Sequence, residues 1–281
     1  MRLLVTGAAG QLGVDVVNHA RGLDDEVIAV AKSDLDITDA DAVRLLLERV
    51  RPDAVINAAA YTAVDACETN EALAFAVNAD AVGHLSAACE VVGAHLVHVS
   101  TDYVFDGMLE RPYREDDTTN PQSVYGRSKL AGEQAVGPAA AIARTSWVCG
   151  EHGNNMVKLV LRLAANPDQA LAFVDDQRGK PTFTTDLAPA LHRLAVDRRT
   201  GTFHVTNQSA VSWYEFVREI LAASGRDPDR VRPIASADLD PPRPAPRPAN
   251  SVLDDTAWRA AGYEPLRDFR EPLAELIARL T

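Results

Sequence analysis

The chain has 281 residues, of which 47% are hydrophobic and 24% are charged, a composition ordinary for a globular protein. That length can hold one large domain, or one domain with a smaller lobe. The formal net charge of −12 argues against a protein that binds a nucleic-acid backbone, because such proteins carry a basic face, so we expect no nucleic-acid partner.

The first half of the chain alternates short apolar runs with longer segments that repeat apolar residues at helical spacing. The runs expected to form strands are residues 3–5, 27–30, 54–56, 95–99 and 140–143. Helices are expected from about residue 11 and over residues 39–50, 71–92 and 123–136. Strands that alternate with helices pair in parallel through right-handed crossovers, so the pattern predicts an α/β fold with a doubly wound parallel sheet of the Rossmann type. Such sheets bind ligands beyond the carboxyl ends of their strands.

The second half of the chain is less regular. Its expected elements are a short strand at 203–205 and helices at 157–165, 186–196 and 212–223, the last with capping-box spacing at its start. Residues 241–248 contain five prolines and can form neither a helix nor a central strand, so they are either an inert linker or a rigid loop that lines a site. We therefore predict a dinucleotide-binding domain at 1–148 and a smaller C-terminal substrate lobe at 149–281, with some segments of the lobe returning to the first domain.

Three glycines follow the first expected strand at the spacing Gly-x-x-Gly-x-x-Gly and open the first helix. Gly7 allows a tight turn, Gly10 lets a pyrophosphate approach the backbone, and Gly13 lets the helix pack on the sheet. The N–H groups at the start of the helix, near Gln11 and Leu12, then face the phosphates. The position of the triplet between a first strand and a first helix predicts a site for a nicotinamide dinucleotide.

The residues after the second strand bear on the choice between NADPH and NADH. An acidic residue there would hold the ribose 2′-hydroxyl of NADH, whereas a basic residue would meet the 2′-phosphate of NADPH. The chain has both Lys32 and Asp34, which favours NADPH only slightly and leaves a solvated loop as the alternative for both. Further residues expected beside the cofactor follow the second and third strands, namely Asp36, Ile37, Ala58, Ala59, Ala60, Tyr61 and Thr62.

A tyrosine and a lysine four residues apart, Tyr125 and Lys129, share one face of a predicted helix. Ser100 and Thr101 lie just past the expected carboxyl end of the fourth strand. A carbonyl that receives a hydride develops negative charge on oxygen, so it needs a proton donor and a second hydrogen bond. We therefore predict Tyr125 as the acid, Lys129 as its electrostatic partner and Thr101 as the hydrogen-bond donor.

The glycine turn, Ser-Thr-Asp-Tyr-Val-Phe at 100–105 and Tyr-x-x-x-Lys-Leu-Ala-Gly-Glu at 125–133 resemble the extended short-chain dehydrogenase/reductase superfamily. Within it, the chain more closely resembles the dTDP-4-dehydrorhamnose reductases. Further matches lie in family order at residues 144–148, 153–155, 176–182 and 247–251. Cys149, where an aromatic residue is more usual, and Met156, where phenylalanine is, depart from the family pattern.

The resemblance implies reduction of the 4-keto group of dTDP-4-dehydro-L-rhamnose to dTDP-L-rhamnose with NADPH or NADH. It also implies that the nucleotide sugar is the partner, with Trp147 near the sugar and Arg247 at the diphosphate or sugar. Core packing and a solvated loop remain the respective alternatives for these two residues. Other residues expected at the substrate are Thr101, Asp102, Asn154, Asn155 and Gln177, the last three being equally suited to fastening a loop.

Three competing functions remain open at this stage. A sugar dehydratase or epimerase shares the fold, but Asp102-Tyr103 after Thr101 is not the acidic pair that a dehydratase uses. A reductase of a related dTDP-4-keto deoxysugar is harder to exclude. A regulatory subunit without activity would be expected to lack the tyrosine or the lysine, and both are present.

Targeting and cysteine signals are weak. No signal peptide is visible, and no stretch is expected to span a bilayer, so we expect a cytoplasmic protein with no membrane partner. The three cysteines are an odd number without metal-ligand spacing, which predicts reduced thiols and no metal site. The oligomeric state stays open, with a homodimer as one candidate.

Overall fold

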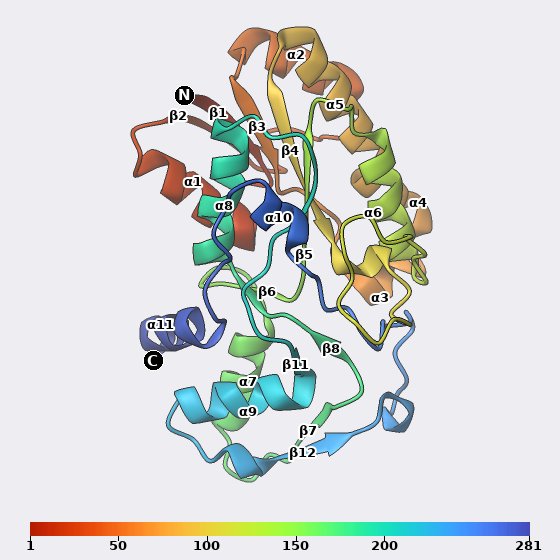
Figure 1. Ribbon diagram of the computed structural model, residues 1–281, viewed down its shortest axis with the longest axis vertical. Helices are drawn as coiled ribbons and strands as arrows, with labels where there is room; N and C mark the ends of the chain where they lie inside the picture. The colour runs from red at the N-terminus through yellow and green to blue at the C-terminus, as the bar shows by residue number, and fades with distance from the viewer.

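A computed structural model describes residues 1–281 and shows a larger upper part and a smaller lower part (Figure 1). The larger part is built on a six-stranded sheet with the strand order β10-β5-β4-β3-β1-β2, and every pairing in it is parallel. Its strands are β1 (Arg2–Thr6), β2 (Glu26–Val30), β3 (Ala54–Asn57), β4 (His95–Thr101), β5 (Ala141–Thr145) and β10 (Gly201–His204). The predicted α/β fold with a parallel sheet is confirmed.

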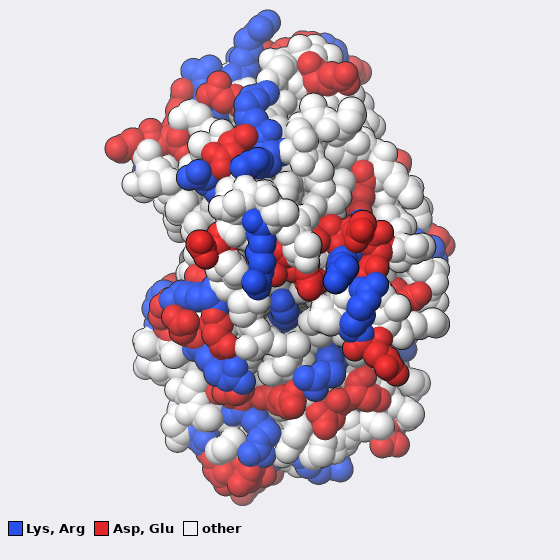
Figure 2. All heavy atoms as spheres, viewed as in Figure 1, with Lys and Arg blue, Asp and Glu red and all other residues white.

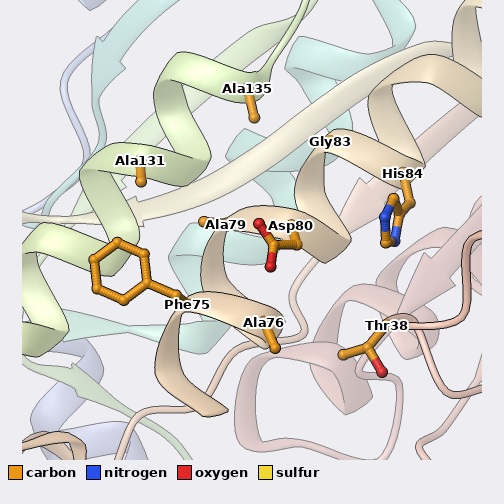
Figure 3. Close-up of a pocket in the computed structure, with 9 residues that line it drawn as sticks. All are labelled: Thr38, Phe75, Ala76, Ala79, Asp80, Gly83, His84, Ala131 and Ala135. Atoms are coloured by element: carbon orange, nitrogen blue, oxygen red, sulfur yellow. The ribbon is translucent and has the colours of Figure 1, made fainter. Parts of the chain in front are cut away.

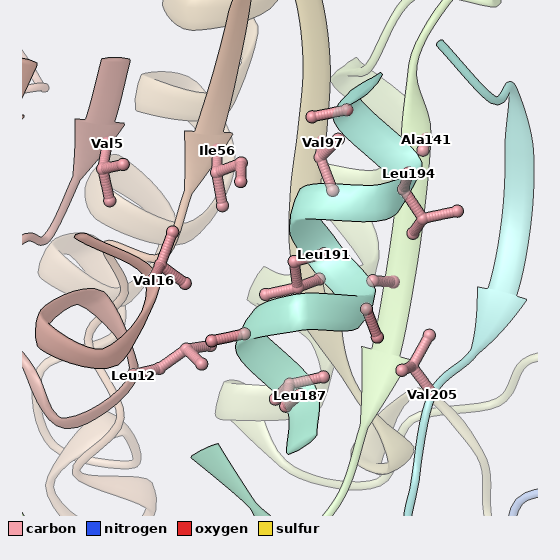
Figure 4. Close-up of a cluster of buried hydrophobic side chains, with 14 of the residues drawn as sticks. Val5, Leu12, Val16, Ile56, Val97, Ala141, Leu187, Leu191, Leu194 and Val205 are labelled. Carbon is pink, nitrogen blue, oxygen red and sulfur yellow. The ribbon is translucent and has the colours of Figure 1, made fainter. Parts of the chain in front are cut away.

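Two layers of helices cover this sheet. One face packs against α1 (Gln11–Arg21) and α8 (Thr184–Val196). The other carries α2 (Ala40–Val50), α5 (Ala81–Val92) and α6 (Val124–Ala135). Leucines spaced along one side of α8 pack against β-strand residues and α1 (Figure 4), because residues four and seven apart share a helix face; they are Leu187, Leu191 and Leu194. This packing closes both sides of the sheet and leaves the carboxyl ends of its strands free for a site.

The expected long helix at 71–92 is one continuous helical run with a local widening. It consists of α4 (Glu71–Phe75), a π-helical turn η1 (Ala76–Asp80) and α5. By length and composition alone the run could cross a membrane, since an 18-residue window in it has a mean hydropathy of 1.2. In the fold the run packs against α2, α6 and β4, which is the behaviour of a core helix.

The smaller part has its own apolar cluster between α7 (Met156–Ala164), α9 (Trp213–Ala223) and α11 (Arg270–Leu280). The expected capping box is present at the start of α9, where Ser212 and Glu215 bond reciprocally. Three two-stranded sheets complete this part. They pair β7 (Leu171–Val174) with β12 (Val231–Ile234), β8 (Arg178–Gly179) with β11 (Val211–Ser212), and β6 (Val148–Cys149) with β9 (Thr182–Phe183).

The chain crosses between the two parts more than once. It enters the smaller part at β6, and then α8 and β10 return to the large sheet. Helix α10 (Thr256–Ala260) packs beside β10, and the proline-rich residues 241–248 form no helix or strand. The remaining short elements are α3 (Val64–Cys67), η2 (Asp102–Val104), η3 (Pro228–Arg230) and η4 (Ser236–Asp238).

Candidate active site

A cavity of about 640 Å³ lies where β1, β3, β4 and β5 end, between the two parts of the molecule. Both halves of the chain contribute to its wall. Fourteen of the residues predicted from the sequence line it, namely Gly10, Gln11, Leu12, Ala58, Ala59, Ala60, Thr62, Ser100, Thr101, Asp102, Tyr125, Lys129, Trp147 and Asn154. The carboxyl ends of the parallel strands therefore bring together residues that lie up to 144 positions apart in the sequence.

The glycine turn has the tight geometry that its spacing predicts. Gly7 has a φ of +67°, and a Cβ on it would lie 2.7 Å from the backbone nitrogen of Ala59. A Cβ on Gly13 would lie 2.1 Å from the carbonyl oxygen of Gly7, so the turn and the helix approach too closely for any side chain there. No side chain caps α1 at Gly10, which leaves the start of that helix available to a phosphate. Gly7 and Gly13 themselves shape the turn from behind, outside the cavity lining.

The two aspartates of the loop after β2, Asp34 and Asp36, accept hydrogen bonds from residues of the same loop. The carboxylate of Asp34 accepts a hydrogen bond from the N–H of Ala31 at 2.9 Å. The carboxylate of Asp36 accepts from the N–H and the hydroxyl of Thr38, and these bonds hold the pKa of Asp36 below its ordinary value. Lys32 is exposed and makes no salt bridge, so it is the group in this loop that is free to meet an anion.

Tyr125 and Lys129 are buried on α6, which Ser123 caps by accepting from the N–H of Gly126. Burial raises the pKa of the Tyr125 phenol above its ordinary value, while a hydrogen bond with Thr101 acts in the opposite direction. Burial lowers the pKa of the Lys129 ammonium to about 8. Its Nζ donates to the carbonyl oxygen of Val99 at 2.7 Å, so the strand that carries Thr101 also positions the lysine. A phenol that keeps its proton at neutral pH can serve as an acid.

Several buried polar atoms at the cavity have no protein partner. They are the hydroxyls of Ser100 and Thr145 and the Oδ2 oxygen of Asp102. Burial raises the pKa of Asp102 to about 6, and the hydrogen bond that its Oδ1 accepts from Thr101 acts in the opposite direction. Buried polar groups in folded proteins are almost always hydrogen-bonded, so these atoms indicate that a polar ligand completes the site. Ser100 and Thr101 end β4 itself, rather than following it as expected from the sequence.

The second half of the chain contributes an aromatic wall. Trp147 lies on Trp213 with the ring centroids 3.5 Å apart and the planes 7° from parallel. Its φ of +48° is rare for a bulky residue, and a Cβ on Gly179 would meet the indole at 2.5 Å. The ring of Trp147 is therefore held in one place from two sides.

Other predicted substrate residues are engaged in fastening the structure. Asn155 caps α7 and donates to Gln11 Oε1 at 2.8 Å, and Gln177 donates to the hydroxyl of Ser236 at 2.7 Å. The guanidinium of Arg247 forms a bidentate pair with Asp65, at 2.5 and 2.8 Å, and is only 14% exposed. Predicted residues that do not line the cavity are Gly7, Gly13, Lys32, Asp36, Ile37, Tyr61, Asn155, Gln177 and Arg247.

Sequence reasoning missed several residues of the site. Trp213 carries no motif of its own, although it directly follows the capping serine of α9. Gly153 has a φ of +66° and approaches the side chain of Gln11, so it joins the two parts of the molecule. The other lining residues beyond those predicted are Val64, Val99, Tyr103, Thr145, Ser146 and Val148. The last four lie within the matching segments 100–105 and 144–148, which could have indicated them.

A second cavity, of about 570 Å³, lies on the opposite side of α6, between that helix, η1 and α5 (Figure 3). Small residues form most of its wall, with Phe75, Asp80 and His84 as the larger side chains. It holds none of the predicted site residues. On the face seen in Figure 2, acidic and basic side chains are interspersed, with no continuous basic surface.

The chain matches known proteins over its whole length. Residues 1–281 match the family described as the RmlD substrate binding domain. A dTDP-4-dehydrorhamnose reductase of Mycobacterium tuberculosis (strain ATCC 25618 / H37Rv) is 47% identical over 99% of this chain and 92% of that protein. A dTDP-4-keto-6-deoxy-D-glucose reductase of Streptomyces niveus is 42% identical over 98% and 96%. The crystal structure of a Bacillus anthracis dTDP-4-dehydrorhamnose reductase in complex with NADP is 34% identical over 99% of both chains, with a TM-score of 0.94.

Proposed function

The chain belongs to the family of the RmlD substrate binding domain, and on that premise we propose that it reduces the 4-keto group of dTDP-4-dehydro-L-rhamnose to give dTDP-L-rhamnose. The observation that carries the proposal is the meeting of Thr101, Tyr125 and Lys129 in one cavity with the glycine turn. NADPH, when bound there, supplies the hydride. A regulatory subunit without activity would have no need of this buried acid and lysine.

The residues of the first half fit the dinucleotide. The open start of α1 at Gly10 would receive the pyrophosphate, and Ala58 and Ala59 leave room beside it. Lys32 would meet a ribose 2′-phosphate, which supports NADPH over NADH because Asp34 is occupied by its own loop. We assign residues 1–148 to binding the dinucleotide and residues 149–281 to binding the substrate, with α8 and β10 returning from the second group to the sheet.

The proton comes from the chain itself. Tyr125 holds its proton because burial disfavours the phenolate, and it releases it when charge develops on the keto oxygen. The Thr101 hydroxyl donates to Asp102 Oδ1 at 2.9 Å. With substrate bound, it would donate to the keto oxygen instead. Lys129, while charged, stabilises the phenolate that remains. Trp147 and Asn154 line the cavity on the side where the sugar would lie.

A reductase of a related dTDP-4-keto deoxysugar is the second candidate. It is favoured by the similarity to the Streptomyces niveus protein. Cys149 and Met156, which depart from the usual residues of the rhamnose family, pack in the apolar cluster of the smaller part and do not line the cavity. The two candidates differ in the sugar that carries the 4-keto group, so an assay over several such sugars distinguishes them.

The test is a steady-state assay of NADPH consumption over a panel of nucleotide-linked 4-keto sugars. We expect the highest kcat/KM with dTDP-4-dehydro-L-rhamnose, and dTDP-L-rhamnose as the product identified by mass spectrometry and NMR. A higher kcat/KM with another dTDP-4-keto sugar would support the second candidate. No NADPH consumption with any of them would contradict both.

The cellular setting follows from the same premise. We propose that the enzyme works in the cytoplasm, which suits three buried cysteines that form no disulfide. A homodimer remains a prediction, to be measured by light scattering of the purified protein at several concentrations.

A further inference from the structure

A buried chain of side chains crosses the sheet and ends on Lys129. Thr6, Asn57 and His98 are direct partners across β1, β3 and β4, so their side chains lie on the same face. Thr6 Oγ1 donates to Asn57 Oδ1 at 2.7 Å, and Asn57 Nδ2 lies 3.1 Å from His98 Nδ1. His98 Nε2 lies 3.3 Å from Lys129 Nζ. None of the four side chains is more than 2% exposed, so no water is expected to replace these contacts.

A backbone N–H group fixes which atom donates and which accepts in this series of hydrogen bonds. The N–H of Ala59, which can only donate, lies 3.1 Å from Asn57 Oδ1, so that oxygen must face Ala59 and Thr6. The amide nitrogen of Asn57 then faces His98 and can only donate, which makes His98 Nδ1 the acceptor. Burial, with the Lys129 charge, lowers the pKa of His98 well below its ordinary value, so the ring is neutral. Its single proton therefore lies on Nε2 and faces the lysine.

We propose that His98, held by Asn57 with its proton on Nε2, is a positioning residue that points an N–H group at Lys129 and favours the neutral form of that lysine. An ammonium has three donors and no acceptor, whereas a neutral amine can accept from Nε2. The ammonium can still donate to the Val99 carbonyl, but on its other side it meets the N–H of His98, which is a donor like itself. His98 therefore acts in the same direction as burial, which lowers the pKa of Lys129 to about 8. The catalytic consequence rests on the proposed function. If Tyr125 is the acid, the contact with His98 helps to set the pH above which Lys129 is neutral and Tyr125 loses its charged partner.

Other titratable groups near α6 do not take the place of His98. Glu133, one turn after Lys129, raises the pKa of the lysine, but its carboxylate is held by Arg144 of β5 at 2.8 and 2.9 Å. Tyr125 lies one turn before it on the same helix. The remaining titratable groups on the elements packed against α6 are Asp65 and Cys67 of α3, Glu71 of α4, Asp80 of η1, His84, Cys89 and Glu90 of α5, His95 of β4, and Asp102 and Tyr103 of η2. The only titratable side chain that contacts the Lys129 amine within 3.5 Å is His98.

Replacing Asn57 by aspartate reverses the direction of these hydrogen bonds with little change in side-chain shape. In Asn57→Asp one carboxylate oxygen still accepts from Ala59 and Thr6, and the other becomes an acceptor facing His98. The ring proton then moves to Nδ1, and Nε2 becomes an acceptor for the Lys129 ammonium. We expect the alkaline limb of kcat/KM, which reports loss of the lysine proton, to move upward by about one pH unit, a tenfold change in the acid constant. A purely structural role for Asn57 would lower activity at every pH and leave that limb in place.

The added charge of the aspartate also acts through space, so a double variant separates the two effects. In Asn57→Asp/His98→Leu the charge remains and the imidazole is absent, and we expect most of the upward shift to disappear. An equal shift in the single and double variants would show that His98 transmits nothing, and the proposal would fail.

Two NMR measurements decide the point without substrate. In the full-length protein with NADP⁺ bound, ¹⁵N ring shifts should place the His98 proton on Nε2, and on Nδ1 in Asn57→Asp. The protein has only four lysines, so ¹³C labelling at Cε should resolve Lys129 and give its pKa in each variant. A proton on Nδ1 in the unchanged protein overturns the proposal even if the variants fail to fold. Failure of the proposed function would instead appear as inactivity on every keto sugar, with these NMR results unaffected.

Discussion

The two sides of the cavity are built on different principles. The proposed cofactor side is made of backbone: a Cβ on Gly7 or Gly13 would lie only 2.7 or 2.1 Å from neighbouring backbone atoms, and the start of α1 is left without a side-chain cap. The sugar side is made of side chains that support one another, such as Trp147 on Trp213 and Arg247 on Asp65. A backbone site leaves a spacing that can be found in the sequence, whereas a side-chain site depends on neighbours that only the fold brings together.

This difference predicts how each side responds to substitution. A substitution in the backbone site should distort the turn, so that cofactor binding and local stability are lost together. A side-chain site should lose affinity for one ligand and leave the other untouched. Between them lies the proposed catalytic group on α6 and β4, where the loss of one hydroxyl should lower the rate most.

The largest effect is expected for Tyr125→Phe, which removes the proton donor at the junction of the two sides. General acid catalysis is worth about 10²–10⁴-fold, so kcat should fall by that factor. The phenylalanine ring fills the same buried space, so NADPH affinity measured by fluorescence titration should stay within about twofold of the unchanged protein. A kcat within a few-fold of the original would remove Tyr125 from its assigned role.

A smaller but still large effect is expected for Gly13→Ala on the cofactor side. The added methyl would lie 2.1 Å from the Gly7 carbonyl oxygen, and that oxygen belongs to backbone that cannot move without opening the turn. Overpacking of this kind typically costs about 1–3 kcal/mol. We expect NADPH binding to weaken by about 10–100-fold, measured by the same titration, with a lower Tm.

Gly83→Ala provides the matched control for that change. Gly83 lies in α5, where a Cβ would meet only the side chain of Ala135 at an ordinary 3.6 Å. Its NADPH affinity should therefore be unchanged. Equal losses in the two variants would show that the cofactor side depends on general stability and not on the geometry of the turn.

The features that the sequence predicted, and those that it missed, divide in the same way between regular backbone and contacts among distant side chains. Periodicity identified the strands of the large sheet and the helices that cover it, because long elements with one buried face repeat their apolar residues. It missed two-residue strands such as β8 and β9, which are too short to show a period. The Tyr-x-x-x-Lys spacing placed both catalytic candidates correctly on one helix, since both ends of the motif lie within one turn of α6. Trp213 and the Asp65 partner of Arg247 escaped notice, because their contacts join segments 66 and 182 positions apart.

On the sugar side, we expect Arg247→Ala to lower kcat/KM for the keto sugar nucleotide by at least tenfold, about 1.4 kcal/mol. The partly buried arginine pairs with Asp65, beside Tyr103 of the cavity wall, so it either binds the diphosphate or holds α3 and the proline-rich loop in place. Separate titrations with NADPH and with the dTDP-linked product distinguish the ligands. A loss of NADPH binding with product binding retained would place Arg247 on the cofactor side.

Asp65→Asn separates the two roles of Arg247. If the guanidinium binds the diphosphate directly, loss of the neutralising carboxylate should leave product affinity unchanged or strengthen it, because the positive charge is then uncompensated. If Arg247 only fastens the loop, Asp65→Asn should weaken product binding about as much as Arg247→Ala, since each change removes the same pair.

The smallest effect is expected for Lys32→Ala, and it tests whether the cofactor side relies on backbone alone. Lys32 is exposed, and contacts between exposed charges are worth about 0.2–1 kcal/mol because water and salt screen them. We therefore expect KM for NADPH to rise by about two- to fivefold, and KM for NADH, which has no 2′-phosphate, to stay the same. The difference should shrink at high ionic strength, because screening weakens the interaction of the lysine with the phosphate. An equal change with both cofactors would mean that Lys32 shapes the loop. No change with either would leave the choice of cofactor to the backbone of the turn between Ala31 and Asp34, where the carboxylate of Asp34 already holds the Ala31 N–H at 2.9 Å.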